Sequence, residues 1–291
     1  MHRAIHTIIA LAAVGAMTTG CVPTRSGHGG GDVQQTELAL LTSDDTGAWD
    51  IAVVDMSGDI QHWVDSNLTQ PVSMAHHPDG FFLVSDGMNI DRVDMDGEVS
   101  RFNQDPMPSV VYRMNITDDG DVTVAEEYDV TRLDKDGNIV AHTTVPDFDY
   151  CWMDAAPGTS PQSGDALLDI FGPTIATWDA ESGAFEPLAE GIGDSLTILG
   201  VDGAGDYYAA AEWDSRIWTV DQDGNADMVG SLSSMGVPAH GVRALESAGT
   251  HSVYALYDGS DGSGIVEVDS DGTTREVMVA EDALWLDMVI F

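Results

Sequence analysis

The sequence predicts an all-β protein, a six-bladed β-propeller whose ring is closed by the C-terminal strand pairing into the first blade. Three observations lead to this fold: a short motif recurs along the chain, strand-like runs flank each copy, and the two ends of the repeat region complete each other. Each copy has an apolar residue, an aspartate and, a few residues later, a glycine. The first aspartates of the six copies are Asp55, Asp94, Asp134, Asp179, Asp221 and Asp269. Their mean spacing of about 43 residues is the length of a four-stranded propeller blade.

Each copy of the motif has the composition of a tight turn between two strands. In residues 94–97, Asp-Met-Asp-Gly, the aspartates would accept backbone N–H bonds and the glycine would adopt a positive φ. Strand-like runs at 81–84, 90–93 and 99–102 supply the strands around this turn. A calcium loop is the alternative, but an EF-hand loop needs more acidic ligands in a twelve-residue frame between helices. We therefore interpret the six motifs as turns.

The two ends of the repeat region predict how the ring closes. Residues 37–41 resemble the second strand of a blade, and no first strand precedes them. Residues 284–291 resemble a first strand with no blade of its own. Pairing of 284–291 with 37–42 would complete the first blade and remove the free sheet edges.

The N-terminal segment predicts export and lipid anchoring. Residues 1–20 have the order of a signal peptide, with a positive start at Arg3, an apolar run over 8–17 and small residues before Cys21. This run is shorter than the ~20 residues of a membrane-spanning helix. Residues 18–21, Thr-Thr-Gly-Cys, resemble a bacterial lipobox, although Thr18 stands where leucine is usual. The resemblance implies cleavage before Cys21 and acylation of Cys21; without this modification the protein would be secreted and soluble.

The predicted anchor defines the domains and the location. Residues 21–36 are polar and glycine-rich and form a lipidated flexible tether, and residues 37–291 form the propeller. Acyl chains on Cys21 would hold the protein at a bacterial membrane in the cell envelope, facing the periplasm or the exterior. Cys151 then has no intramolecular partner.

The charge of the chain excludes some partners. Fifty Asp and Glu residues against ten Lys and Arg residues give a formal net charge of −40. Such a surface repels nucleic-acid phosphates, so we expect no nucleic-acid partner. The charge is explained either by solubility in a salty medium or by binding of divalent cations such as calcium.

Acidic residues in the predicted loops between the second and third strands of the blades are candidate metal ligands. These loops would lie at the mouth of the central channel, where carboxylates suit calcium. The candidates are Asp86, Glu126, Glu127, Glu212 and Asp214. The alternative is that these acids cap the turns that follow the second strands.

A second group of candidate residues lies on or next to the predicted inner strands. Arginines are scarce in this chain, so those at inner positions would either pair with acids or hold a carboxylate or sulfate group of a ligand. The histidines would move protons or bind metal, or else have only structural contacts. An aromatic ring would stack on a sugar or pack in the core. The candidates are His76, Arg113, Trp152, His240, Arg243 and Asp287.

Residues 77–99, 118–140 and 206–224, of which the first begins His-Pro-Asp-Gly, are similar to blades of the NHL, gluconolactonase and streptogramin-lyase group of propellers. This resemblance implies the fold, but no active site follows from it. The lactonases have a Gly-Glu-Gly-Pro stretch where this chain has Thr-Glu-Leu-Ala at 36–39. The lyases have Trp-Phe-Thr-Glu where this chain has Phe-Phe-Leu-Val at 81–84.

Three functions are compatible with the sequence. The first is a non-enzymatic, membrane-tethered binding module for a protein, peptide or glycan, which the tether, the fold and the lack of a catalytic motif favour. The second is a calcium-dependent hydrolase or lactonase with its site at the mouth of the channel. The third is a salt-adapted surface protein without a small-molecule site.

Overall fold

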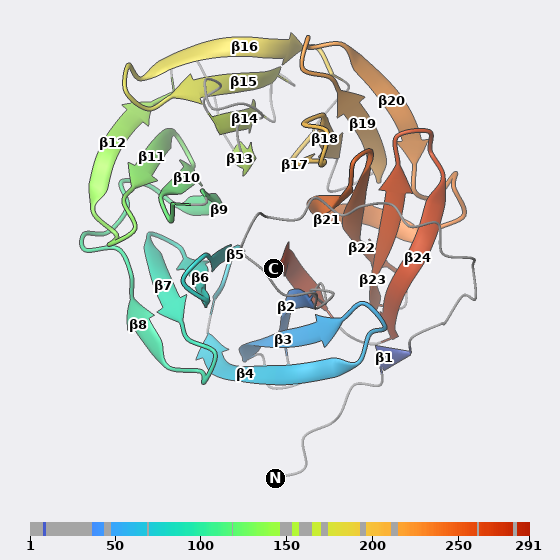
Figure 1. Cartoon of the computed structure of the whole chain (residues 1–291), viewed down its shortest axis with the longest axis horizontal. Helices are drawn as coiled ribbons and strands as arrows, with labels where there is room; N and C mark the ends of the chain where they lie inside the picture. Colours follow the sequence, from blue (N-terminus) through green and yellow to red (C-terminus); the bar gives the residue numbers. More distant parts are fainter. Residues whose placement is uncertain are drawn as a thin grey trace, which may run out of the picture.

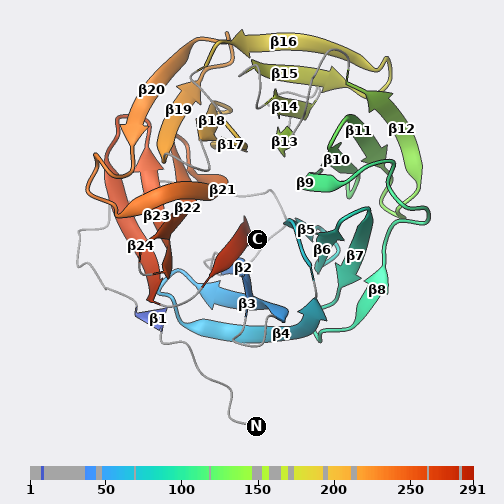
Figure 2. The same ribbon diagram turned by 180° about the vertical axis from the view of Figure 1, so that it is seen from behind.

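The computed structural model describes twelve segments of the chain, and every structural statement below concerns these segments. They are residues 8–9, 37–43, 48–68, 70–117, 119–145, 153–156, 165–169, 174–192, 196–210, 215–260, 262–281 and 284–291. Their strands form six antiparallel sheets arranged as blades around a central axis (Figures 1 and 2). The protein is a β-propeller, as the sequence predicts. Within the described segments, no helix is long and apolar enough to cross a membrane.

Each blade has four strands, which we letter A to D from the axis outward. Blade 1 contains β25 (Trp285–Ile290), β2 (Glu37–Ser43), β3 (Trp49–Asp55) and β4 (Ile60–Leu68). Blade 2 contains β5 (Met74–His77), β6 (Phe81–Asp86), β7 (Asn89–Val93) and β8 (Val99–Arg101). Blade 3 contains β9 (Val111–Ile116), β10 (Val122–Glu126), β11 (Asp129–Leu133) and β12 (Ile139–Thr144).

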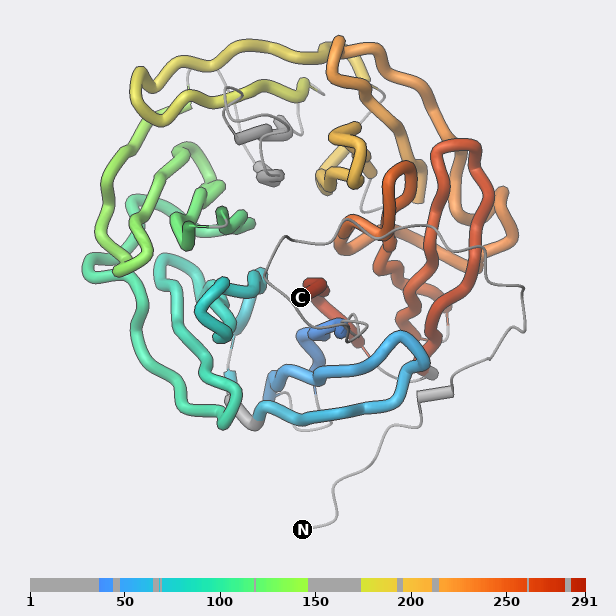
Figure 3. Tube along the Cα trace, viewed as in Figure 1, coloured from blue at the N-terminus to red at the C-terminus, as the bar shows by residue number. Residues whose placement is uncertain are grey.

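Blades 4 to 6 continue around the ring in the same direction, as the tube in Figure 3 shows. Blade 4 contains β13 (Met153–Ala156), β14 (Asp165–Asp169), β15 (Thr174–Asp179) and β16 (Ala184–Glu190). Blade 5 contains β17 (Ile198–Val201), β18 (Tyr207–Ala210), β19 (Arg216–Val220) and β20 (Ala226–Ser231). Blade 6 contains β21 (Ala239–Gly249), β22 (Ser252–Gly259), β23 (Gly262–Asp269) and β24 (Thr274–Glu281).

Blade 1 combines the beginning and the end of the propeller segment. Strand β25 pairs with β2 in the register Leu38↔Ile290 and Leu40↔Met288. The amide of Phe291 donates to the carbonyl oxygen of Glu37 at 3.2 Å. The predicted closure of the ring by the C-terminal strand is confirmed.

A short strand from the predicted signal peptide adds to blade 6. Strand β1 (Ile8–Ile9) pairs with the outer strand β24, with Ile8 opposite Ala280 and Ile9 opposite Val279. Cleavage before Cys21 would remove β1 and leave blade 6 with four strands, like the other five.

The recurring Asp and Gly residues form turns between strands C and D, as predicted. In blade 2, the amide of Gly97 donates to the carbonyl oxygen of Asp94 at 2.8 Å, and Gly97 has φ +85°. In blade 3, Oδ1 of Asp134 accepts the amides of Asp136 at 3.0 Å and Asn138 at 2.9 Å. These N–H groups lie in the turn, where strand pairing provides no acceptor for them, and the aspartate side chain supplies one.

The core lies between the faces of neighbouring blades. Between blades 1 and 2, for example, Leu41, Ile51 and Val64 pack with Phe82 and Val93, all of them buried. Alternation of apolar residues along each strand places one set of side chains on each face, so every blade contributes to two such layers. This packing holds the inner strands rigidly around the axis, where the candidate residues lie.

Candidate functional site

The two ends of the ring differ in the loops they carry. Because neighbouring strands of a blade are antiparallel, the B–C loops and the D–A connections lie at one end, which we call the B–C end. The A–B turns lie at the other end, which we call the A–B end. The sequence places the candidate metal ligands at the B–C end.

Arg113 connects opposite sides of the ring at its axis. It lies on β9 in blade 3, and its Nη2 donates to the carbonyl oxygen of Arg243 on β21 in blade 6 at 2.8 Å. Its Nη1 donates to the carbonyl oxygen of Val72 at 3.4 Å and lies 3.8 Å from Oδ2 of Asp287 on β25. The guanidinium therefore joins the inner strands of blades 1, 3 and 6.

Asp287 is the buried acid of this axial group. Its Oδ2 accepts the amide of Met74 at the start of β5, at 2.8 Å, and its Oδ1 accepts the amide of Met288 at 2.9 Å. Burial raises the pKa of Asp287, and the charge of Arg113 and the two N–H donors oppose this rise. The sequence leaves two interpretations for the inner arginines, which are pairing with acids and binding an anionic group of a ligand. In the structure, Arg113 pairs with the acid Asp287.

The other described candidates of the inner strands differ in their contacts. Arg243 donates through Nε to Oδ2 of Asp258 at 2.5 Å. His76 stacks on Phe291, with ring centroids 4.5 Å apart, and His240 is exposed. Arg113, Arg243 and Asp287 thus meet at the axis, whereas His76 packs against the C-terminal residue.

Glu126 is fully buried at the end of β10 and fixes the D–A connection between blades 2 and 3. Its Oε2 accepts the amide of Ser109 at 2.8 Å, and its Oε1 accepts the hydroxyl of Thr131 at 2.5 Å. The Thr131 hydroxyl lies 3.0 Å from Nδ1 of His142, and burial raises the pKa of Glu126. In this structure Glu126 binds Ser109 of the D–A connection and Thr131 of β11 instead of capping the turn that follows β10.

The remaining candidates divide between described and undescribed parts of the chain. Asp86 and Glu127 are partly exposed in the B–C loops of blades 2 and 3. Cys21, Trp152, Glu212 and Asp214 lie outside the described residues. The proposed roles of these residues, including any calcium site, remain predictions.

At the B–C end, the loops of blades 2 and 3 each carry one exposed apolar side chain. Met88 is 42% exposed and Tyr128 is 38% exposed. Backbone hydrogen bonds join their loops through the connection 103–110: Met107 N to Met88 O at 2.8 Å, and Glu127 N to Val110 O at 3.0 Å. We call residues 86–88, 103–110 and 127–128 the Met88–Tyr128 surface.

The side chains of Asn103 and Glu126 fix the 103–110 connection of this surface. Oδ1 of Asn103 accepts the amide of Ile90 at 2.8 Å, and Nδ2 of Asn103 donates to the carbonyl oxygen of Asp105 at 2.7 Å. Glu126 holds the other end of the connection at Ser109. The surface is therefore preorganised, which lowers the entropic cost of binding a partner.

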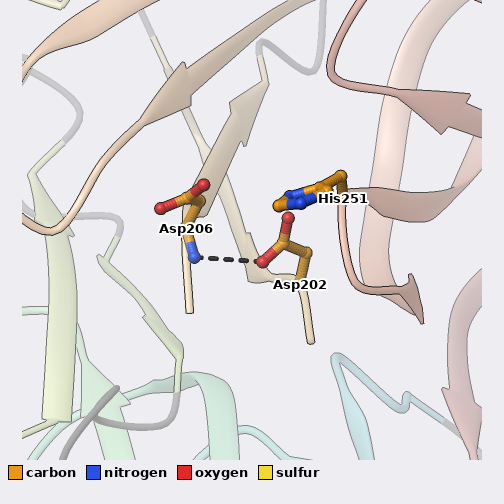
Figure 4. Close-up of side chains that lie close together, drawn as sticks. All are labelled: Asp202, Asp206 and His251. Atoms are coloured by element: carbon orange, nitrogen blue, oxygen red, sulfur yellow. Dashed lines mark hydrogen bonds between the residues drawn. The ribbon is translucent and has the colours of Figure 1, made fainter. Parts of the chain in front are cut away.

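A cluster at the A–B end was not among the candidates from the sequence. Asp202 and Asp206 of blade 5 and His251 of blade 6 each offer one ligand atom, and these atoms lie within 4.8 Å of one another (Figure 4). Asp202 and Asp206 belong to the A–B turn of blade 5, and His251 belongs to that of blade 6. The five-residue Asp-Gly-Ala-Gly-Asp stretch at 202–206 is a signal in the sequence, but its histidine partner comes from another repeat.

Comparison with known proteins supports the fold. No protein-family model and no curated protein sequence matches the chain. Among solved structures, it is similar to a protein of unknown function from Bacteroides caccae, with a TM-score of 0.68, 14% identity and coverage of 89% of this chain and 99% of that one. It is also similar to a streptogramin B lyase (TM-score 0.59, 14% identity, 84% and 87% covered) and to a chain of a nidogen/laminin complex (TM-score 0.63, 12% identity, 88% and 98% covered). At these identities the likeness establishes the β-propeller fold alone.

Proposed function

We propose that the protein is an exported bacterial lipoprotein whose propeller is a binding module for a protein or peptide partner. The signal-peptide pattern of residues 1–20 and the lipobox-like stretch ending at Cys21 support export and anchoring. The tether of residues 21–36 would hold the propeller away from the membrane surface. The place of action is then the bacterial cell envelope, facing the periplasm or the exterior.

The observation that carries the binding function is the Met88–Tyr128 surface. Two large apolar side chains stand exposed on loops that buried Asn103 and Glu126 hold in place. A rigid aromatic ring and a flexible methionine are side chains that protein interfaces favour. The same three segments also carry Asp86, Asp105 and Glu127, so the surface suits a partner with an apolar anchor flanked by basic side chains.

The calcium-dependent hydrolase or lactonase is the alternative hypothesis. For Glu126 to become a ligand, it would have to give up its hydrogen bonds to the amide of Ser109 and the hydroxyl of Thr131, which fix the D–A connection. The axial Arg113 would also place a positive charge beside any cation bound at the inner strands. These contacts favour the binding module.

Lipidation is tested by metabolic labelling of the full chain with a clickable fatty acid. We expect label on the wild-type protein and none on Cys21→Ala. Thr18→Leu, which restores the usual lipobox residue, serves as a matched control and should be labelled at least as well. Equal labelling of Cys21→Ala would overturn the anchor.

The binding surface is tested by photo-crosslinking in the producing cells, with the reactive residue placed at 128. The matched control position is 140, where Val140 is exposed on the outer strand β12. We expect a defined adduct from position 128 that disappears in Met88→Ser and weakens in high salt, and no such adduct from position 140. Equal adducts from both positions, or an adduct unaffected by Met88→Ser, would contradict the proposal, and binding to a glycan array alone would assign a glycan ligand instead.

A further inference from the structure

The cluster at the A–B end holds a carboxylate in a fixed orientation. Oδ1 of Asp202 accepts three backbone amides in its own turn, from Ala204 at 2.8 Å, Gly205 at 3.0 Å and Asp206 at 3.0 Å. These three bonds leave the carboxylate no freedom to rotate. The second oxygen, Oδ2, is therefore directed away from the turn.

This second oxygen is buried and lacks a hydrogen-bond partner among the described residues. Asp202 is only 5% exposed. Figure 4 shows one oxygen of Asp202 joined to the amide of Asp206 and the other directed toward the imidazole of His251. A buried carboxylate oxygen without a partner is costly, and an oxygen that faces two other ligand atoms suits a cation.

The contact between blades 5 and 6 places His251 opposite this oxygen. The amide of Gly203 donates to the carbonyl oxygen of Gly249 at 2.7 Å, and a Cβ on Gly203 would lie only 3.0 Å from that oxygen. The carbonyl oxygen of His251 accepts the hydroxyl of Tyr208 and the amide of Ser270, both at 2.9 Å. The backbones on both sides of the cluster are thus fixed, so the two turns that carry the ligands are preorganised.

The corresponding turn of blade 2 shows what a purely structural arrangement looks like. His77 occupies the position of Asp202, and its Nδ1 accepts the amide of Asp79 at 3.1 Å. Its Nε2 lies 3.2 Å from the carbonyl oxygen of Gly120 in the A–B turn of blade 3. Both polar atoms of His77 therefore have partners, whereas one oxygen of Asp202 has none.

We propose that Asp202, Asp206 and His251 form a binding site for a divalent transition-metal ion, with zinc as the ion that fits best. Zinc accepts carboxylate oxygen and imidazole nitrogen ligands, and three protein ligands with water in the fourth position is a common arrangement. Calcium and magnesium prefer sites made of oxygen atoms alone. The bound ion would neutralise Asp202 and link blade 5 to blade 6, at the end of the ring opposite the Met88–Tyr128 surface.

The site is tested by zinc titration of the EDTA-treated full chain, using calorimetry at high salt so that screening suppresses weak binding to the acidic surface. Asp202→Asn keeps the oxygen that caps the turn and removes the second carboxylate oxygen, and His251→Ala alters an exposed side chain. The matched controls are Asp79→Asn, at a 76% exposed acid in the blade 2 turn, and His240→Ala, at an exposed histidine of β21.

We expect one zinc ion per wild-type chain. Asp202→Asn and His251→Ala should each weaken binding by more than about tenfold, since even outer-shell partners contribute that much to metal affinity. Both controls should bind as the wild type does. Zinc at about 100 times the wild-type Kd should raise the Tm of the wild type by about 5–10 °C and that of His251→Ala by no more than about half as much.

Three results would overturn the site. The first is zinc affinity that is the same in the wild type and in both ligand variants. The second is binding of several zinc ions per chain that salt abolishes. The third is calcium binding as tight as zinc binding and independent of His251, which would assign the affinity to surface carboxylates.

Discussion

The guanidinium of Arg113 donates a hydrogen bond to the carbonyl oxygen of Arg243 across the axis of the propeller, at 2.8 Å. The same guanidinium lies 3.8 Å from Asp287, which is buried on the strand that closes the ring. Asp287 also accepts the amide of Met74 from blade 2. The closing strand is therefore fixed at the axis by polar contacts in addition to its pairing with β2.

Replacing Arg113 should destabilise the whole ring. Arg113→Met keeps much of the side-chain volume and leaves the carboxylate of Asp287 buried without its countercharge. We expect the free energy of unfolding to fall by about 3 kcal/mol, as for other broken buried ion pairs. Urea unfolding followed by circular dichroism measures this change.

The double variant Arg113→Met/Asp287→Asn is the matched control. The neutral amide that replaces the carboxylate of Asp287 needs no countercharge from Arg113, so much of the lost stability should return. A double variant as unstable as the sum of the two single variants would show that the pair does not interact.

Glu126 should make stability depend on pH in a direction opposite to that of a typical salt-bridged acid. Burial raises the pKa of Glu126 in the folded protein above its usual value of 4.5. Between the two pKa values the folded state binds more protons than the unfolded state, so this group's contribution to stability is present at low pH and is lost as pH rises through the folded pKa. Each unit of pKa difference corresponds to about 1.4 kcal/mol.

Glu126→Gln removes this titration while keeping the shape of the side chain. The free energy of unfolding of the variant, relative to that of the wild type, should increase as pH rises from 4.5 to 7. Glu126→Ala removes the same titration and also the hydrogen bonds, so it should follow the pH dependence of Glu126→Gln with a free energy of unfolding lower by about 2 kcal/mol. A difference between Glu126→Gln and wild type that does not vary with pH would contradict the proposed cause of the pKa shift.

The turns and the closure of the ring could be predicted because their signals are local in the sequence. The turn at Asp134 is complete within five residues, and the unmatched strand at 284–291 is visible at the chain end. The partners at the axis could not be predicted, because Arg113 and Arg243 are 130 residues apart and meet only through the curvature of the ring. The ligand cluster at Asp202 was missed for the same reason, since His251 belongs to the next blade and reaches the cluster through the close packing of Gly203.

The glycine of the recurring motif also has a role that the sequence pattern does not reveal. Gly137 has φ +79°, and a Cβ there would lie 2.1 Å from the carbonyl oxygen of Phe102 in the preceding blade. Gly224 meets Leu188 of the preceding blade in the same way, at 2.0 Å. These glycines therefore allow both the turn and the close approach of two blades.

Gly137→Ala and Gly80→Ala separate these two effects. Gly80 has a similar φ of +85°, and nothing lies within 4 Å of a Cβ placed there. Gly80→Ala should cost only the backbone strain of about 1–2 kcal/mol, whereas Gly137→Ala should cost clearly more because the two blades must separate. Differential scanning calorimetry of the two variants measures the difference, and equal Tm values would mean that inter-blade packing at the turn contributes nothing.

The closing strand provides the most direct test of the ring. Trp285 is buried against Leu38, Leu40 and other residues of blades 1 and 6, while its neighbour Leu284 is 48% exposed. Trp285→Ala should lower the free energy of unfolding by about 3–5 kcal/mol, and Leu284→Ala should change it by less than about 0.5 kcal/mol. Deleting residues 284–291 should abolish the cooperative transition, because it also exposes the inner edge of β2 and removes Asp287 from the axis. A truncated chain that melts at the wild-type temperature would mean that the remaining blades are stable as an open arc, and the ring would not depend on its closing strand.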